Sequence, residues 1–176
     1  MRTMRAFRKT GPCQGEVVEI EAPTVADDEC LVRIKACGIC AWDANTWIPL
    51  YGLLIAPGIT GHEIGGVVAE TGKRSRKWQE GDKVVIYGIR SCGKCTHCRQ
   101  RNYRYCAEKS AIVNGFAEYV TAPWDRLLPM PPNLSFAEAS LLIDVVGTPL
   151  HGIRRGGVNR KTTVGVWGLG PVGLGG

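Results

Sequence analysis

The chain has 176 residues, of which 44% are hydrophobic and 22% charged, with a formal net charge of +6; these proportions are ordinary for a soluble globular protein and allow one domain with the start of another. Its apolar runs are short, the longest being interrupted by Asp144, which excludes a membrane-spanning helix. The first residues are basic but lack the apolar run of a secretory signal, so we expect a cytoplasmic protein.

The first 130 or so residues are predicted to be rich in β-structure. Alternating or wholly apolar runs recur there, separated by glycine, proline and aspartate turn signals. Many short strands favour a barrel or sandwich over a doubly wound sheet. The predicted strands cover residues 16–20, 30–35, 64–70, 83–87 and 116–121.

Two helices are predicted after this region. Ser135 and Glu138 have the spacing of a capping box, in which each side chain accepts a hydrogen bond from the other residue's backbone, and the helix is expected to continue to about Ile143. Thr148 as N-cap and Pro149 as first residue would start a second helix, ending at Gly156-Gly157. Asp144 is then expected near the break, where a carboxylate can turn toward a site.

The last segment predicts a strand over 162–167 followed by the pattern G-x-G-x-x-G at Gly168, Gly170 and Gly173. This is the phosphate-approach turn of a dinucleotide-binding unit. Gly168 would allow the tight turn, Gly170 the approach of a pyrophosphate, and Gly173 close packing of helix on strand. One strand cannot make a coenzyme domain, so we expect the chain to stop just inside one.

Four cysteines, Cys92, Cys95, Cys98 and Cys106, have the spacing C-x2-C-x2-C-x7-C. Two-residue gaps let tight turns present successive thiolates to one tetrahedral zinc ion, which four sulfurs would close to substrate. The sequence therefore predicts a structural zinc lobe over residues 91–109. Disulfides or free thiols are the alternative, and His97 is interpreted as a surface residue.

A second group of metal-ligand residues is separated in sequence. Cys40 and His62 are the residue types that build a zinc site with an open position, where zinc acts as a Lewis acid. Cys37 rivals Cys40 on spacing, and a lone Cys and a lone His are more often packing residues than ligands. Trp42 and Trp47 either line the substrate side or are ordinary core or rim aromatics.

The basic side chains of the lobe raise the alternative of nucleic-acid binding. No aromatic platform or basic helix accompanies them, so we expect no nucleic-acid partner. The cations are interpreted as solvating a lobe made acidic by its thiolates. They are Arg90, Lys94, Arg99, Arg101, Arg104 and Lys109.

Taken in order, these motifs resemble the zinc-containing medium-chain dehydrogenases, the alcohol dehydrogenase-like family, over nearly the whole chain. The resemblance rests on four stretches: Cys37-Gly38-Ile39-Cys40, Gly61-His62-Glu63-Ile64-Gly65-Gly66, the cysteine lobe and the glycine-rich turn. It implies a mainly β GroES-like barrel over 1–157 that includes the lobe. Residues 158–176 would begin a truncated Rossmann domain for NAD or NADP, and a homo-oligomer is expected for the longer protein.

The resemblance also implies roles for individual residues. Cys40 and His62 match the first two ligands of a catalytic zinc, and Asp144 falls where the family places the third. Glu63 matches a carboxylate beside the metal, and Asp43 the acid that orients the ligand histidine. With the lobe, two zinc ions per chain are expected.

One position departs from the family pattern. Trp42 stands where many members have a serine or threonine that passes on the substrate proton, and an indole cannot relay a proton. Asn45, Glu63 or a water would take over. We expect hydride transfer between an alcohol or carbonyl substrate and NAD(P) in the longer protein, with the 176-residue chain inactive alone. A non-catalytic zinc-binding module is the alternative.

Overall fold

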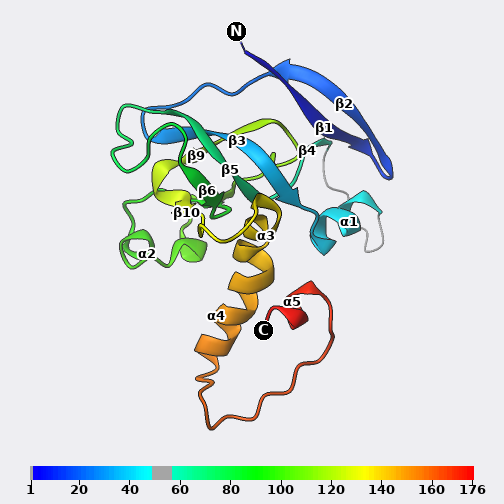
Figure 1. Cartoon of the computed structure of the whole chain (residues 1–176), viewed down its shortest axis with the longest axis vertical. Helices are drawn as coiled ribbons and strands as arrows, with labels where there is room; N and C mark the ends of the chain where they lie inside the picture. The colour runs from blue at the N-terminus through cyan, green and yellow to red at the C-terminus, as the bar shows by residue number, and fades with distance from the viewer. Residues whose placement is uncertain (1, 49–56) are drawn as a thin grey trace.

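The computed structural model describes residues 2–48 and 57–176. Its first two-thirds form two larger antiparallel sheets (Figure 1) and a two-stranded ribbon of β7 (Ile89–Arg90) and β8 (Ser110–Ala111). The smaller sheet has the order β2-β1-β4 and the larger β10-β6-β5-β3-β9. A single bridge between Ala6 and Ala117 joins β1 to the chain before β9. The bounds are β1 Thr3–Gly11, β2 Gln14–Glu21, β3 Glu29–Gly38, β4 Gly58–Ile59, β5 Glu63–Thr71, β6 Lys83–Ile86, β9 Tyr119–Pro123 and β10 Leu127–Pro129.

The mainly β prediction is confirmed, with differences at particular strands. Strand β1 and the short strands β4, β7, β8 and β10 were not among the predicted strands. The strand predicted over 116–121 lies at Tyr119–Pro123 instead. Residues 116–118 instead face β1: the Phe116 carbonyl accepts from Phe7 N, and Glu118 N donates to Arg5 O.

The core lies on the larger sheet, where apolar side chains of β3, β5 and β6 meet. Val32, Ile64, Val84 and Ile86 are fully buried there. Both faces of β5 are covered at its start, because α3 (Phe136–Ser140) packs on the strand beside Gly65. A methyl group at Gly65 would lie 3.1 Å from the Phe136 carbonyl oxygen. This close approach brings the helical segment to the end of the sheet where His62 lies.

A helical rod descends from the sheets (Figure 1). It consists of α3, a π-helical turn η3 over Leu142–Val146, and α4 over Gly147–Arg155. The capping box is confirmed: Glu138 N donates to Ser135 Oγ at 3.3 Å, and Ser135 N donates to Glu138 Oε2 at 2.8 Å. None of the described helices is long and apolar enough to cross a membrane.

The predicted start of the second helix is wrong. Its first residue is Gly147 and its N-cap Val146, so Thr148 is not the cap. The π-helical turn leads directly into α4, since Gly147 N donates to carbonyls of that turn, and Pro149 is the third residue of α4. The predicted end is confirmed, since α4 stops at Arg155 with Gly156 as C-cap.

The strand predicted over 162–167 is not formed. These residues have no strand pairing, and Trp167 is wholly exposed. A strand needs a neighbouring ladder for its backbone, and the described residues supply none beside it. The glycine turn nevertheless forms: Gly168 has φ +93°, and Gly170 is the N-cap of α5 (Pro171–Leu174). A methyl group on Gly173 would overlap the Gly168 carbonyl oxygen.

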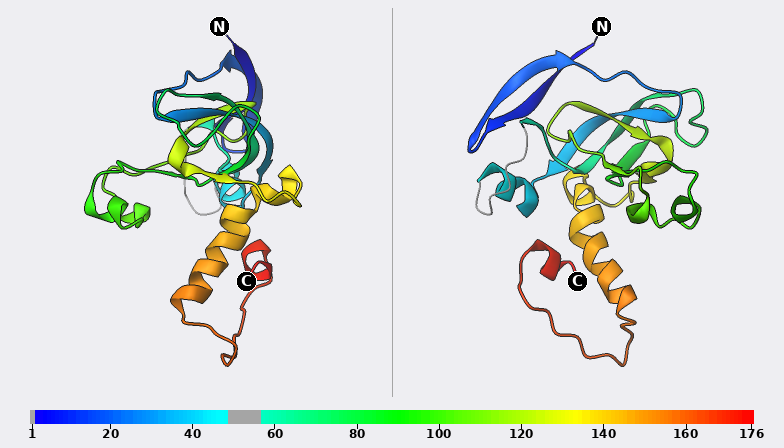
Figure 2. Two further views of the ribbon diagram at one scale, coloured as in Figure 1. Left: turned by 60° about the vertical axis from the view of Figure 1, so that its left-hand side comes forward. Right: turned by 180° about the vertical axis from the view of Figure 1, so that it is seen from behind.

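The cysteine lobe projects from the larger sheet (Figure 2). The chain enters the lobe through β7 (Ile89–Arg90) and leaves it through β8 (Ser110–Ala111), which pair to form a two-stranded neck. Inside the lobe are α2 (Thr96–Arg99) and the 3-10 turn η1 (Tyr103–Tyr105). At the other end of the sheet, α1 (Ala41–Trp47) follows β3.

Candidate metal centres

The four lobe cysteines converge as the spacing predicts. Cys95 caps α2, Cys98 lies within it, and Cys106 follows η1. One ligand atom from each of the four residues lies within 4.8 Å of all the others. The sulfurs of Cys92 and Cys98 are 3.8 Å apart, which matches the separation of about 3.8 Å expected for two thiolates about 2.3 Å from a tetrahedral ion.

The backbone of the lobe favours thiolates. N–H groups of Lys94 and Cys95 lower the pKa of Cys92 to about 6, and Cys92 N donates to Cys106 Sγ at 3.5 Å. The pKa of Cys95 moves the other way, to about 11: the Cys98 amide lowers it, but the neighbouring sulfurs together outweigh that effect. Four neighbouring thiols cannot all ionise without a cation, because their negative charges repel one another. A divalent metal ion would offset that repulsion.

The disulfide alternative does not describe this structure. All eight cysteines are free thiols, and a disulfide would need sulfurs about 2.05 Å apart. His97 is exposed and packs against Tyr105, with ring centroids 5.7 Å apart, as expected of a surface residue. The lobe therefore fits a closed zinc site.

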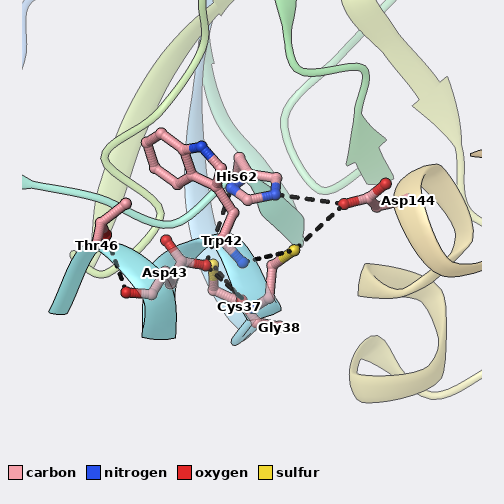
Figure 3. Close-up of polar contacts among 8 residues, drawn as sticks. Cys37, Gly38, Trp42, Asp43, Thr46, His62 and Asp144 are labelled. Atoms are coloured by element: carbon pink, nitrogen blue, oxygen red, sulfur yellow. Dashed lines mark hydrogen bonds and ion pairs between the residues drawn. The ribbon is translucent and has the colours of Figure 1, made fainter. Parts of the chain in front are cut away.

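A second group consists of Cys40, His62, Glu63 and Asp144, with ligand atoms within 4.8 Å of one another. Figure 3 shows the His62 ring and the Asp144 carboxylate of this group facing each other. Asp144 Oδ2 lies 3.5 Å from both Cys40 Sγ and His62 Nε2. The sulfur–oxygen separation suits a weak hydrogen bond, and the nitrogen–oxygen separation is at the long end of the range for one. Both separations match the roughly 3.4–3.5 Å expected between sulfur, nitrogen and oxygen ligands of one tetrahedral zinc. The three ligand residues implied by resemblance thus lie around one point.

Helix α1 fixes the position of Cys40. Cys40 is its N-cap, and the Cys40 sulfur accepts from Trp42 N at 3.5 Å while Cys40 N donates to Asp43 Oδ2 at 3.0 Å. This is a capping box in which a thiol replaces the usual hydroxyl. Burial raises the pKa of Cys40, an effect that the Trp42 amide opposes. The helix therefore holds the Cys40 sulfur 3.5 Å from Asp144 Oδ2.

Asp43 lies behind His62 rather than among the ligands. Its side chain is 5% exposed and its Oδ2 is 3.9 Å from His62 Nδ1. That is ion-pair range but long for a hydrogen bond. Within the described residues, Asp43 Oδ1 has no hydrogen-bond partner. The orienting role implied by resemblance is compatible with this placement and stays a prediction.

Asp144 reaches the site from the π-helical turn η3. Thr148 Oγ1 donates to Asp144 Oδ1 at 2.8 Å, which leaves Oδ2 facing Cys40 and His62. Burial raises the pKa of Asp144, but hydrogen bonds from Thr148, Cys40 and His62 together bring it below its ordinary value. The carboxylate is therefore kept ionised, as a metal ligand must be. We missed the role of Thr148, although the i, i+4 spacing to Asp144 signals it.

Glu63 and Cys37 occupy the inner side of the site. Glu63 is 3% exposed, and its pKa is raised first by burial and then by the charge of Asp144. Burial also raises the pKa of Cys37 to about 12, and its sulfur donates to the Gly38 carbonyl at 3.6 Å. Cys37 is not in the ligand group, so the structure favours Cys40 over Cys37.

Trp42 and Trp47 have different surroundings. Trp42 meets His62 edge-on, with ring centroids 6.0 Å apart and planes at 86°, and is 44% exposed beside the group. Trp47 instead packs on Phe7 of β1 at 5.6 Å. Trp42 alone of the pair is placed to contact a molecule at the candidate metal.

Comparison with known proteins places this architecture in a family. The model of the alcohol dehydrogenase GroES-like domain matches residues 26–132. An alcohol dehydrogenase of Geobacillus stearothermophilus is 34% identical over 167 residues, covering 90% of this chain and 49% of that protein. The chain spans about half the length of the curated relatives it matches.

Two solved structures share the fold. Alcohol dehydrogenase TADH from Thermus sp. ATN1 superposes with a TM-score of 0.87 at 31% identity, over 97% of this chain and 53% of that one. A proposed zinc-binding dehydrogenase from Sinorhizobium meliloti 1021, bound to NADP, gives 0.82 at 28% identity, over 99% and 52%. The chain belongs to the zinc-type alcohol dehydrogenase-like family and contains its GroES-like domain.

Proposed function

We propose that this chain is the metal-binding catalytic part of a zinc-dependent alcohol dehydrogenase-type oxidoreductase that transfers hydride between an alcohol or carbonyl substrate and NAD(P). One observation carries the proposal: Asp144 Oδ2 lies at ligand-to-ligand distance from both Cys40 Sγ and His62 Nε2. These three residues would hold the catalytic zinc, and the four lobe cysteines the structural one.

Zinc with three protein ligands supplies Lewis acidity toward the oxygen of an alcohol or carbonyl. The residues around it have separable tasks. Asp43 holds the backbone of Cys40, and Thr148 holds the outer oxygen of Asp144. Trp42 presents the edge of its half-exposed indole at the same face, where it would limit the width of a bound substrate.

Proton movement is the step for which this chain departs from its family. Trp42 can donate a hydrogen bond but cannot pass a proton on. Glu63 is buried within the ligand group. A carboxyl group can accept a proton and pass it on, so Glu63 is our candidate for the relay, ahead of Asn45 or a water.

The coenzyme would be bound by the longer protein. Gly168, Gly170 and Gly173 form the expected turn without a sheet behind it, and such turns receive a pyrophosphate at a helix start. The Sinorhizobium meliloti relative is bound to NADP. We accordingly propose a GroES-like catalytic domain over 1–157 and the beginning of a Rossmann domain over 158–176. A cytoplasmic location suits the eight free thiols, and a homo-oligomer stays a prediction.

The test compares the 176-residue chain with a version extended to the length of its relatives. Both are assayed for NADH or NADPH formation with a panel of primary alcohols, secondary alcohols and polyols. We expect activity only in the extended version, abolished by Cys40→Ala. An extended version that holds zinc but reduces neither coenzyme with any alcohol would favour the non-catalytic zinc-binding module.

A further inference from the structure

The cysteine lobe is attached to the barrel by little backbone. Strands β7 and β8 share only two residue pairs, Ile89 with Ala111 and Arg90 with Ser110. Figure 2 shows the lobe standing out from the sheets on this neck. A two-stranded ribbon of this length has little stability of its own. Side chains must therefore fix how the lobe sits on the barrel.

Two basic side chains of the described residues link the lobe region to the barrel: Arg90 of the neck pairs with Glu29 of β3, and Arg126 lies between the lobe and the barrel. It belongs to the barrel, at the end of a 3-10 turn (Trp124–Arg126) directly before β10, where its carbonyl accepts from Tyr87 N at 2.8 Å. The residue is 2% exposed. An arginine that deeply buried is rare without partners, because removing its charge from water is costly.

The partners of Arg126 come largely from the lobe. Its Nη2 donates to Ser91 Oγ at 2.8 Å, and its guanidinium carbon lies 3.6 Å from the ring centroid of Tyr103. The same nitrogen is 3.2 Å from Asp125 Oδ2, an acid that is 39% exposed. Within the described residues its buried Nε has no hydrogen-bond partner. The cation is thus not fully compensated by the barrel itself.

Both lobe partners of Arg126 stand beside metal-binding cysteines. Ser91 directly precedes Cys92, and Tyr103 lies in the turn that leads into Cys106. Four thiolates around one divalent ion leave a net negative charge on the metal site itself, and a buried guanidinium that contacts residues flanking this site is attracted by that charge.

We propose that Arg126 is a positioning residue that couples metal binding by the four lobe cysteines to docking of the lobe on the barrel. The guanidinium holds the Ser91 hydroxyl and the Tyr103 ring. Because these two residues flank Cys92 and lead into Cys106, the contact fixes where the cysteines of the lobe lie. This coupling goes beyond the proposed function, because it concerns the structural site and needs no substrate or coenzyme. By linkage, a group that stabilises the metal-bound lobe more than the metal-free lobe must raise its metal affinity.

The test measures zinc affinity of the lobe by competition with a chromophoric chelator. The full chain carries Cys40→Ser in every sample, so that the second group does not contribute. We expect Arg126→Met to weaken zinc binding by about tenfold or more, because it removes a charged hydrogen bond and a cation–π contact. Arg126→Lys, which keeps the charge without the planar fork, should recover part of the loss. Arg99→Met removes an exposed lobe cation instead and should change the affinity by less than about twofold.

A second measurement separates coupling from simple loss of stability. Zinc-loaded chains are digested briefly with trypsin, which can cut the lobe at Arg99, Arg101 and Arg104. The loaded parent should resist, whereas loaded Arg126→Met should be cut in the lobe. Ser91→Ala leaves the barrel intact and should also weaken zinc binding, which keeps the test informative if Arg126→Met fails to fold. Unchanged zinc affinity in Arg126→Met, or an equal loss in Arg99→Met, would overturn the proposal.

Discussion

A single methyl group at Gly38 should disturb the candidate catalytic site by displacing Glu63. Gly38 ends β3 and pairs with Glu63 at the start of β5. A methyl carbon built there overlaps Glu63 Oε2 and lies 3.0 Å from its Cδ and 3.1 Å from its Cβ. Glu63 is 3% exposed and surrounded by Cys40, His62 and Asp144, so it has no free space into which to rotate.

Overpacking of this kind costs about 1–3 kcal/mol. For a chain of this size, about 2 kcal/mol corresponds to a fall in melting temperature of about 4–8 °C, measured by circular dichroism on zinc-loaded Gly38→Ala. Gly152→Ala is the matched control, since nothing lies within 4 Å of a methyl group there and alanine is favoured in a helix. It should be neutral or stabilising.

The double variant Gly38→Ala/Glu63→Ala tests whether displacement of Glu63 causes the loss of stability. If Glu63 is what the methyl group displaces, Gly38→Ala should cost much less in a Glu63→Ala background, with a coupling energy of about 1 kcal/mol or more. A cost that is the same in both backgrounds, or a melting temperature of Gly38→Ala equal to that of Gly152→Ala, would refute the reasoning.

Two further predictions concern Thr148 and the capping box of α3. Thr148→Val removes the bond that holds Asp144 Oδ1 at 2.8 Å and should weaken zinc binding at the Cys40 group by about threefold to tenfold. Thr148→Ser should retain the zinc affinity of the Cys40 group, and neither variant should change zinc binding by the lobe. An unchanged zinc affinity in Thr148→Val would count against the positioning of Asp144 by Thr148. Hydrogen bonds from the Ser135 amide and hydroxyl lower the pKa of Glu138 in the folded chain below its ordinary value of 4.5. The stabilisation that the Glu138 carboxylate provides is therefore fully present above pH 4.5. It is lost as the pH falls through the lowered pKa of the folded chain. Ser135→Ala keeps the backbone amide and removes only the hydroxyl bond, so an NMR titration should find the pKa of Glu138 raised part of the way toward 4.5. An unshifted pKa would contradict the contribution assigned to the hydroxyl.

Local patterns predicted local structure well. The capping box at Ser135 and the end of α4 at Gly156 depend on residues close to one another in sequence, and both formed as expected. The lobe cysteines converge for the same reason, since tight turns bring them together. The strand predicted over 162–167 failed because a strand depends on distant partners for its hydrogen bonds, and no such partner lies beside those residues in the described part of the chain.

The candidate catalytic site could be predicted only with help from the family resemblance. Spacing alone could not bring Cys40, His62 and Asp144 together, because sheet topology and the packing of α3 on Gly65 determine where they meet. Thr148 was assigned to a helix cap because a π-helical turn is not visible in a hydrophobic pattern. Arg126 carried no signal at all, since its burial arises from the contact of the lobe with the barrel.

Counting metal ions tests the central claim most directly. Elemental analysis of the purified chain, and of a Cys40→Ala variant prepared in parallel, reports how many zinc ions each holds. The account predicts about two per chain in the parent, one in each ligand group, and about one in the variant, retained by the lobe. One zinc ion in both proteins would show that Cys40, His62 and Asp144 do not share a metal.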